Sequence, residues 1–193
     1  MDADAVELRV LGCLIEKQRT TPDAYPLSLN SLRLACNQST NRDPVVDYDE
    51  PTIRDALQRL STRGWVRLAS GAGSRAVKYR HLLDDALALS DAELSLLAVL
   101  IVRGPQTTGE LKQRTERLFH FDSPADAEAV LEALIQRELV ARLPRRPGEK
   151  GQRYAQLLGG DDEPVSQPTD SLEARVARLE ADVRSLKEEL HGR

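Results

Sequence analysis

The residues best suited to a chemical role lie on one face of a predicted helix over residues 50–63. Apolar residues recur there at helical spacing and form one stripe, which leaves the polar residues on the opposite side. Arginine and glutamine side chains pair with the edges of guanine and adenine in the major groove of DNA. The candidate base-contacting residues are Arg54, Gln58, Arg59, Thr62 and Arg63.

Two basic hairpins supply candidate phosphate contacts. Arg75 and Lys78 lie on the predicted hairpin that follows this helix, where cations suit the DNA backbone. The tip of a second predicted hairpin, near the end of the second half, carries a cluster of cations that can bind the DNA backbone without reading the base sequence. The candidate residues of this cluster are Arg145, Arg146 and Lys150.

The helix before the second hairpin is a poorer candidate for DNA. Its polar face presents Asp126, Glu128 and Glu132, and acidic side chains repel phosphate. We expect this half of the chain to serve packing or to bind a protein partner, with its hairpin as an additional phosphate clamp. A solvated basic loop is the alternative interpretation of that hairpin.

The sequence lacks the spacing patterns of catalytic and metal sites. His81, His120 and His191 are far apart, and no pair has the separation of zinc ligands on a helix. Cys13 and Cys36 occupy apolar helix positions and are interpreted as small core residues. No phosphate-binding glycine loop, dinucleotide fingerprint or nucleophile elbow occurs. We therefore expect a protein that is not an enzyme, with no catalytic residue, cofactor or metal.

Composition narrows the class of partner. The 193-residue chain has a net charge of -4, but residues 1–82 hold 12 Lys and Arg against 10 Asp and Glu, so an anion-binding surface is expected there. Aromatic residues make up 4% of the chain, too few for a platform that stacks single-stranded nucleic acid. No run of about 18 apolar residues occurs, and the acidic N-terminus lacks the features of a signal peptide. These observations predict a cytoplasmic protein without a membrane partner.

The chain repeats its own pattern. A capping residue followed three positions later by glutamate marks a helix start at Asp4 and again at Ser90. The apolar residues after the two caps match at an offset of 86 residues, and the offset falls to 74 near Arg63 and Arg137. The first copy is therefore longer, and residues 37–49 are the polar, turn-rich loop that accounts for the difference.

Each copy has three predicted helices followed by two short strands. In the first copy the helices cover residues 5–19, 28–36 and 50–63, and the hairpin covers 65–79. In the second copy the helices cover residues 91–103, 108–120 and 124–137, and the hairpin covers 139–157. This order is the plan of the winged helix-turn-helix, in which the third helix enters the DNA major groove. The predicted fold class is mostly α with small β-hairpins (α+β), as two tandem winged helix-turn-helix domains over residues 1–84 and 85–158.

Several segments resemble a known bacterial family. They are GCLIEKQRTTPDAYPLSLNSLRLACNQSTNRDPVV (12–46), SGAGSRAVKY (70–79), RGPQTTGEL (103–111) and RPGEKGQRY (146–154). On these segments the chain closely resembles the YceH family over most of residues 5–158. The resemblance implies tandem winged helices, no known catalytic or cofactor residues, and no established biochemical role. Thr108 stands at a helix start where the family often has proline.

The C-terminal segment predicts a homodimer. Residues 159–170 are rich in Asp, Gly and Pro and are interpreted as a flexible linker. Apolar residues then alternate at spacings of four and three over residues 171–193, the heptad pattern of a coiled coil with two parallel strands. A single helix packed back onto the body is the alternative. The predicted dimerisation residues are Leu172, Val176, Leu179, Val183, Leu186 and Leu190.

Two functions of different classes follow from these features. The leading one is a DNA-binding, transcription-associated homodimer that uses the third helix and the hairpin of the first domain on double-stranded DNA. The alternative is a non-enzymatic scaffold in which both winged helices bind protein partners, as in chromosome-organising complexes. A small-molecule sensor is a weaker third option, because the sequence gives no indication of a pocket.

Overall fold

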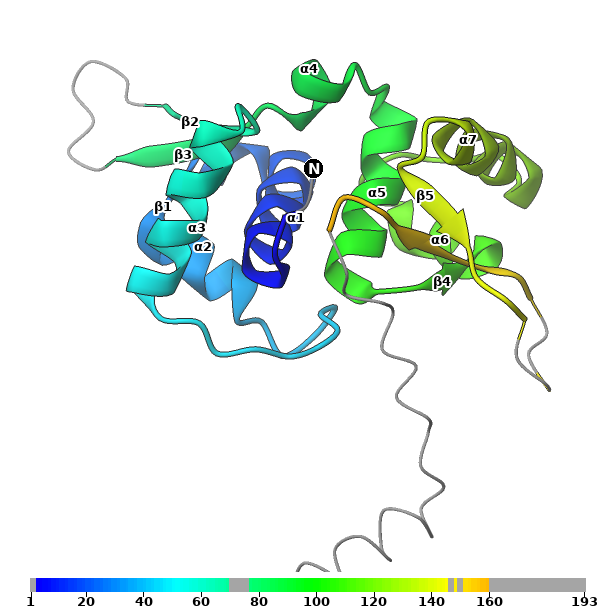
Figure 1. Ribbon diagram of the computed structural model, residues 1–193, viewed down its shortest axis with the longest axis horizontal. Helices are drawn as coiled ribbons and strands as arrows, with labels where there is room; N and C mark the ends of the chain where they lie inside the picture. Colours follow the sequence, from blue (N-terminus) through cyan, green and yellow to red (C-terminus); the bar gives the residue numbers. More distant parts are fainter. Residues whose placement is uncertain (1–2, 70–76, 146–147, 149–150, 160–193) are drawn as a thin grey trace, which may run out of the picture. The chain divides into compact units, whose positions relative to one another are not determined.

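The computed structural model describes residues 3–69, 77–145, 148 and 151–159 (Figure 1). The predicted coiled coil over residues 171–193 and all but the first residue of the predicted linker lie outside these ranges. Within the described ranges, no helix combines the length and the apolar character that crossing a membrane requires.

The first half of the chain contains three main helices and three short strands. The helices are α1 (Ala5–Thr20), α2 (Leu29–Cys36) and α3 (Glu50–Thr62), and the strands are β1 (Leu27–Ser28), β2 (Val66–Leu68) and β3 (Lys78–His81). A 3-10 turn, η1 (Pro22–Ala24), joins α1 to β1. The strands form an antiparallel sheet in the order β1-β3-β2. A short helix, α4 (Leu83–Leu87), leads into the second half.

The second half repeats this order. Its helices are α5 (Asp91–Arg103), α6 (Thr108–Thr115) and α7 (Pro124–Gln136), and its strands are β4 (Gln106–Thr107), β5 (Val140–Arg142) and β6 (Arg153–Gln156). The sheet order is β4-β6-β5, again antiparallel. The expected fold class, mostly α with small β-hairpins, is confirmed. The order of helices and strands is the one that a winged helix requires, and the assignment of each half to that fold stays a prediction.

Reciprocal caps explain where several helices begin. The Asp4 side chain accepts a hydrogen bond from the Glu7 N–H, and the Glu7 side chain accepts one from the Asp4 N–H, at 2.8 and 2.9 Å. Ser90 and Glu93 form the same arrangement at the start of α5. The predicted pairing of these two helix starts is confirmed.

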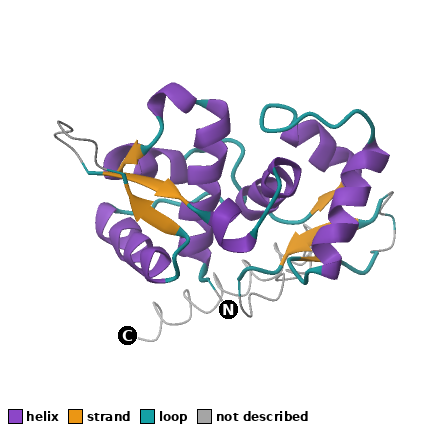
Figure 2. Ribbon diagram, turned by 90° about the horizontal axis from the view of Figure 1, so that it is seen from above, coloured by secondary structure: helices purple, strands orange, loops and turns teal. Residues whose placement is uncertain are grey.

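The two halves share one set of buried apolar residues, and α1 packs against α5 between the two sheets (Figures 1 and 2). Gly12 of α1 makes this close approach possible. A Cβ atom at Gly12 would lie 2.7 Å from the Cγ2 atom of Ile101 and 2.7 Å from the Cγ1 atom of Val102. A larger residue at this position therefore has to displace these side chains of α5.

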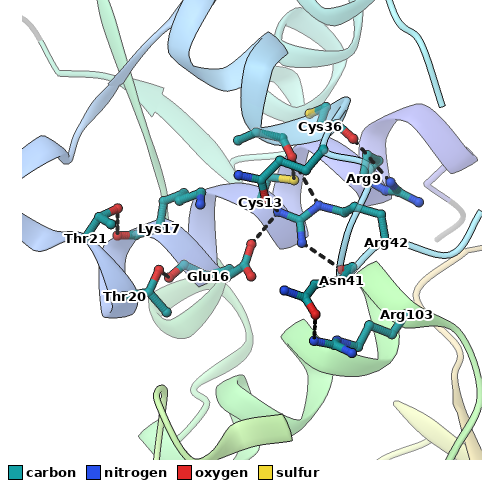
Figure 3. A network of polar contacts seen from close by, with 12 residues as sticks. Arg9, Cys13, Glu16, Lys17, Thr20, Thr21, Cys36, Asn41, Arg42 and Arg103 are labelled. Carbon is teal, nitrogen blue, oxygen red and sulfur yellow. Dashed lines mark hydrogen bonds and ion pairs between the residues drawn. The ribbon is translucent and has the colours of Figure 1, made fainter. Parts of the chain in front are cut away.

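The long loop between α2 and α3 is fixed by a buried arginine. Arg42 donates hydrogen bonds to the Ala35 carbonyl at 3.1 Å and to the Glu16 carboxylate at 2.5 Å, and it also contacts Gln38 (Figure 3). Its side chain is fully buried. Because a buried charge requires such partners, this network ties the loop to α1 and α2.

The same loop also reaches the second half. Arg103 at the end of α5 donates to the Asn41 side-chain oxygen, and the Asp43 N–H donates to the Val102 carbonyl at 2.9 Å (Figure 3). Asn41 and Asp43 of the loop thus bond to α5, while their interpretation as turn-forming residues stays a prediction.

Candidate nucleic-acid interface

Helix α3 presents the predicted candidate face. Asp49 caps it by accepting a hydrogen bond from the Thr52 N–H at 2.9 Å, and Ile53, Ala56, Leu57 and Leu60 are buried. Hydrogen bonds from Thr52 lower the pKa of the Asp49 carboxyl, which places a negative charge at the positive end of the helix. The apolar stripe fixes which side of α3 faces the solvent.

Two of the five candidate residues on α3 are held by the start of α1. Arg59 Nη2 lies 2.7 Å from Asp4 Oδ2, and Arg63 Nε lies 3.2 Å from Glu7 Oε1. Glu7 is also 3.7 Å from Arg59 Nε, and its side chain is 2% exposed. The Arg63 guanidinium further lies 5.9 Å from the centre of the Trp65 ring. Both arginines therefore join α3 to α1, a role that competes with base contact.

The second half forms the equivalent ion pair. Glu93 and Arg137 stand at the repeat positions of Glu7 and Arg63, and Arg137 Nη1 lies 2.9 Å from Glu93 Oε1. Burial opposes ionisation of Glu93, but hydrogen bonds from Ser90 and Arg137 outweigh it and lower the pKa of the carboxyl. A contact that recurs in both halves is a feature of the fold, so Arg63 has a structural role first.

The other three candidates on α3 remain on its exposed side. Arg54 is 57% exposed, and its only described ion pair is a 4.0 Å contact with Glu50 one turn earlier. Gln58 and Thr62 are exposed, and the Thr62 hydroxyl donates to the Gln58 carbonyl at 3.1 Å. Asp55 is exposed on the same side. This smaller set, Arg54, Gln58 and Thr62, is the part of α3 that can reach a groove.

The hairpin of the first half adds cations on one face of its sheet. Lys78 lies at the start of β3, and Arg80 lies two residues further along the same strand. Arg67 of β2 pairs directly with Arg80. Successive side chains of a strand alternate between faces, so these three cations share the face opposite buried Val66. Arg75 lies outside the described residues.

The second half offers less to DNA. Arg145 is exposed after β5, whereas Arg146 and Lys150 lie outside the part of the chain that the structure describes. On α7, Asp126 and Glu128 are exposed as expected. The third predicted acid, Glu132, forms an ion pair with Arg142 of β5.

Three titratable side chains, His81, Cys13 and Cys36, are buried in the core of the first half. His81 is buried, its Nδ1 accepts a hydrogen bond from the Leu83 N–H, and burial lowers its pKa to about 4. Contact with the Cys13 thiol and burial raise the pKa of the Cys36 thiol. Among the described residues, no three His, Cys, Asp or Glu side chains converge as metal ligands would.

Comparison with known proteins agrees with the resemblance stated from the sequence. A UPF0502 protein of Geotalea uraniireducens is 46% identical over 97% of this chain and 91% of its own length. A UPF0502 protein of Pelobacter propionicus is 48% identical over 95% of this chain and 90% of its own. A third, of a Shewanella species (strain ANA-3), is 42% identical over 98% of this chain and 96% of its own.

A family model described as "Protein of unknown function, DUF480" matches residues 3–149. The match covers all of α1 to α7 and ends before β6. The chain belongs to this DUF480 family of bacterial proteins, which confirms the YceH-type assignment.

Proposed function

We propose that the protein binds double-stranded DNA through α3 and the hairpin of its first half, as a transcription-associated protein. The observation that carries this proposal is that α3 packs against α1, α2 and β2, all from the first half, while Arg54, Gln58 and Thr62 stay exposed. An exposed third helix that precedes a β-hairpin has the position of a recognition helix in a winged helix-turn-helix, although here a long loop separates it from α2.

The structure suggests separate roles for the candidate residues. Arg54 and Gln58 are suited to base edges, because arginine and glutamine can form two hydrogen bonds with guanine and adenine. Lys78 is suited to phosphate. Arg59 and Arg63 set the position of α3 through Asp4 and Glu7, and so act on DNA binding indirectly. In this proposal, the C-terminal heptads join two copies and set the spacing of their two recognition helices.

Salt dependence tests the proposal. Binding of the full chain to a labelled mixed-sequence duplex is followed by fluorescence anisotropy over a range of salt concentrations. Each lost phosphate contact lowers the log–log slope by about 0.9, so Lys78→Gln should lower it by that amount. Arg54→Gln should weaken binding as well.

Arg117→Gln is the matched control, because Arg117 is an exposed turn residue of the second half and the charge change is identical. Affinity and slope should be unchanged in this variant. If the parent chain does not bind the duplex, or if Arg117→Gln has the same effect as Lys78→Gln, the proposed interface is wrong.

A scaffold that binds protein is the second candidate, and one observation favours it. The exposed side of α7 carries acids and small residues, which suits a basic protein partner better than DNA. These residues are Ala125, Asp126, Glu128, Ala129 and Ala133. Affinity purification after nuclease treatment distinguishes the two functions, because a protein partner that remains bound and is lost in Glu128→Lys supports the scaffold.

A further inference from the structure

A pocket of about 570 Å³ opens beside the sheet of the first half. Its walls come from the end of α1, the segment before β1, and strands β2 and β3. It is lined by Gln18, Tyr25, Pro26, Arg67, Leu68, Ala69 and Arg80. This volume falls within the range of about 300–1,000 Å³ that small-molecule sites occupy. None of the described residues that line the pocket is acidic.

Two arginines face each other across the strands at this pocket. Arg67 and Arg80 are directly paired in the register of β2 and β3. Like charges in such a position repel, because the side chains of a cross-strand pair lie close together on the same face. Among the described residues, neither guanidinium forms an ion pair, and the buried Nε of Arg80 has no hydrogen-bond partner. A bound anion would relieve this repulsion.

The second half shows that the fold does not need arginine at these positions. Strands β5 and β6 pair in the same way as β2 and β3, and the pair that corresponds to Arg67 and Arg80 is Ala141 and Ala155. Two alanines are therefore compatible with this hairpin. The two arginines of the first half require another explanation, and ligand binding provides one.

Neutral donors complete the pocket. The Tyr25 hydroxyl accepts a hydrogen bond from the His81 N–H at 2.8 Å, which leaves its own proton to donate. Burial raises the pKa of Tyr25 to about 12, so the phenol keeps that proton at neutral pH. The Gln18 side-chain oxygen lies 2.5 Å from His81 Nε2, which leaves the Gln18 amide N–H₂ for a ligand.

We propose that this pocket binds a small molecule through a phosphoryl group. Two guanidinium groups match the double negative charge and the several acceptor oxygens of a phosphate better than the single charge of a carboxylate. The pocket is larger than a phosphate ion, so it has room for the rest of the ligand beside Pro26. If the protein binds DNA, this ligand could regulate that binding. The phosphate site itself is proposed independently of DNA binding.

Calorimetric titration of the full chain with inorganic phosphate tests the site. The parent should bind phosphate, and Arg67→Ala and Arg80→Ala should each weaken binding by about tenfold or more, the usual effect of losing a charged hydrogen bond. Arg117→Ala removes an equal charge elsewhere and should leave the affinity unchanged. Acetate at the same ionic strength should bind more weakly than phosphate.

Further measurements make the proposal falsifiable. In phosphate-free buffer, Arg67→Ala should unfold at no lower urea concentration than the parent, because it removes a like-charge pair. Equal phosphate affinity in the parent and the two pocket variants would overturn the proposal, as would equal binding of acetate. Displacement of phosphate by a DNA duplex would assign these arginines to the DNA backbone and overturn the small-molecule site, whereas simultaneous binding supports it.

Discussion

Replacement of Glu7 by glutamine tests the conclusion that the start of α1 holds Arg59 and Arg63. The amide keeps an oxygen that can accept the Asp4 N–H, so the cap can persist while the negative charge is lost. The Glu7 side chain is 2% exposed, and Arg63 and Arg59 are 3.2 and 3.7 Å from its Oε1. The variant therefore isolates the ion pair from the helix cap.

The expected loss of stability follows from burial and geometry. Removing one partner of a fully buried ion pair costs about 3–5 kcal/mol, but the two arginine side chains are 28% and 46% exposed and can turn towards water. A charge-assisted hydrogen bond is worth about 1.5–3 kcal/mol. We expect Glu7→Gln to lower the free energy of unfolding by about 2–3 kcal/mol.

Urea unfolding at pH 7, followed by circular dichroism, measures this loss. Glu93→Gln is the matched control, because Glu93 forms the equivalent pair with Arg137 but both side chains are more exposed, at 13% and 36%. Its cost should be about 1 kcal/mol. The role assigned to Glu7 is wrong if Glu7→Gln lowers the free energy of unfolding by no more than Glu93→Gln does. It is also wrong if the effects of Glu7→Gln and Arg63→Gln add in the double variant.

Two further predictions concern the α1–α5 contact and a buried histidine. Gly12→Ala should lower the free energy of unfolding by about 1–3 kcal/mol, because its Cβ would meet Ile101 at 2.7 Å. Gly109→Ala is the control and should be neutral or stabilising, because no described atom lies within 4 Å of its Cβ. Equal urea midpoints for the two variants would contradict the close contact. His81 has a folded-state pKa of about 4 against 6.5 for the free group, so the unfolded chain binds the proton first as pH falls, and stability is lost between about pH 6.5 and 4. From pH 7 to pH 5 the loss of unfolding free energy should be about 2 kcal/mol in the parent and should be absent in His81→Gln. Glutamine is chosen because the second half carries Gln156 at the equivalent position. If the variant still loses stability in acid, the loss belongs to other groups.

Local signals in the sequence predicted most of the helices. Asp4 and Ser90 mark the starts of α1 and α5 because a cap and its glutamate are three residues apart, a pattern visible without the fold. Strands β1 and β4 were not predicted, because two residues are too few to show alternation. Helix α6 ends at Thr115, five residues before its predicted end.

The candidate site was less accessible to sequence reasoning, because it depends on contacts between distant residues. Arg63 was a reasonable candidate for DNA on helical spacing alone, yet its partner Glu7 lies in another helix. The repeat contained a signal for that pair, since both Glu and Arg recur at Glu93 and Arg137. The buried position of Arg42 and the pocket at Arg67 depend on tertiary packing, which periodicity does not describe.

The location of bound DNA on the protein directly tests whether α3 and the hairpin of the first half form the interface. Backbone amide chemical shifts of the labelled full chain, recorded with and without a duplex, report which segments are affected. We expect shifts in α3 around Arg54, Gln58 and Thr62 and at Lys78 in β3, with little change in α7. Shifts confined to α7 or to β5 and β6, or no shifts at a saturating concentration of duplex, would contradict it.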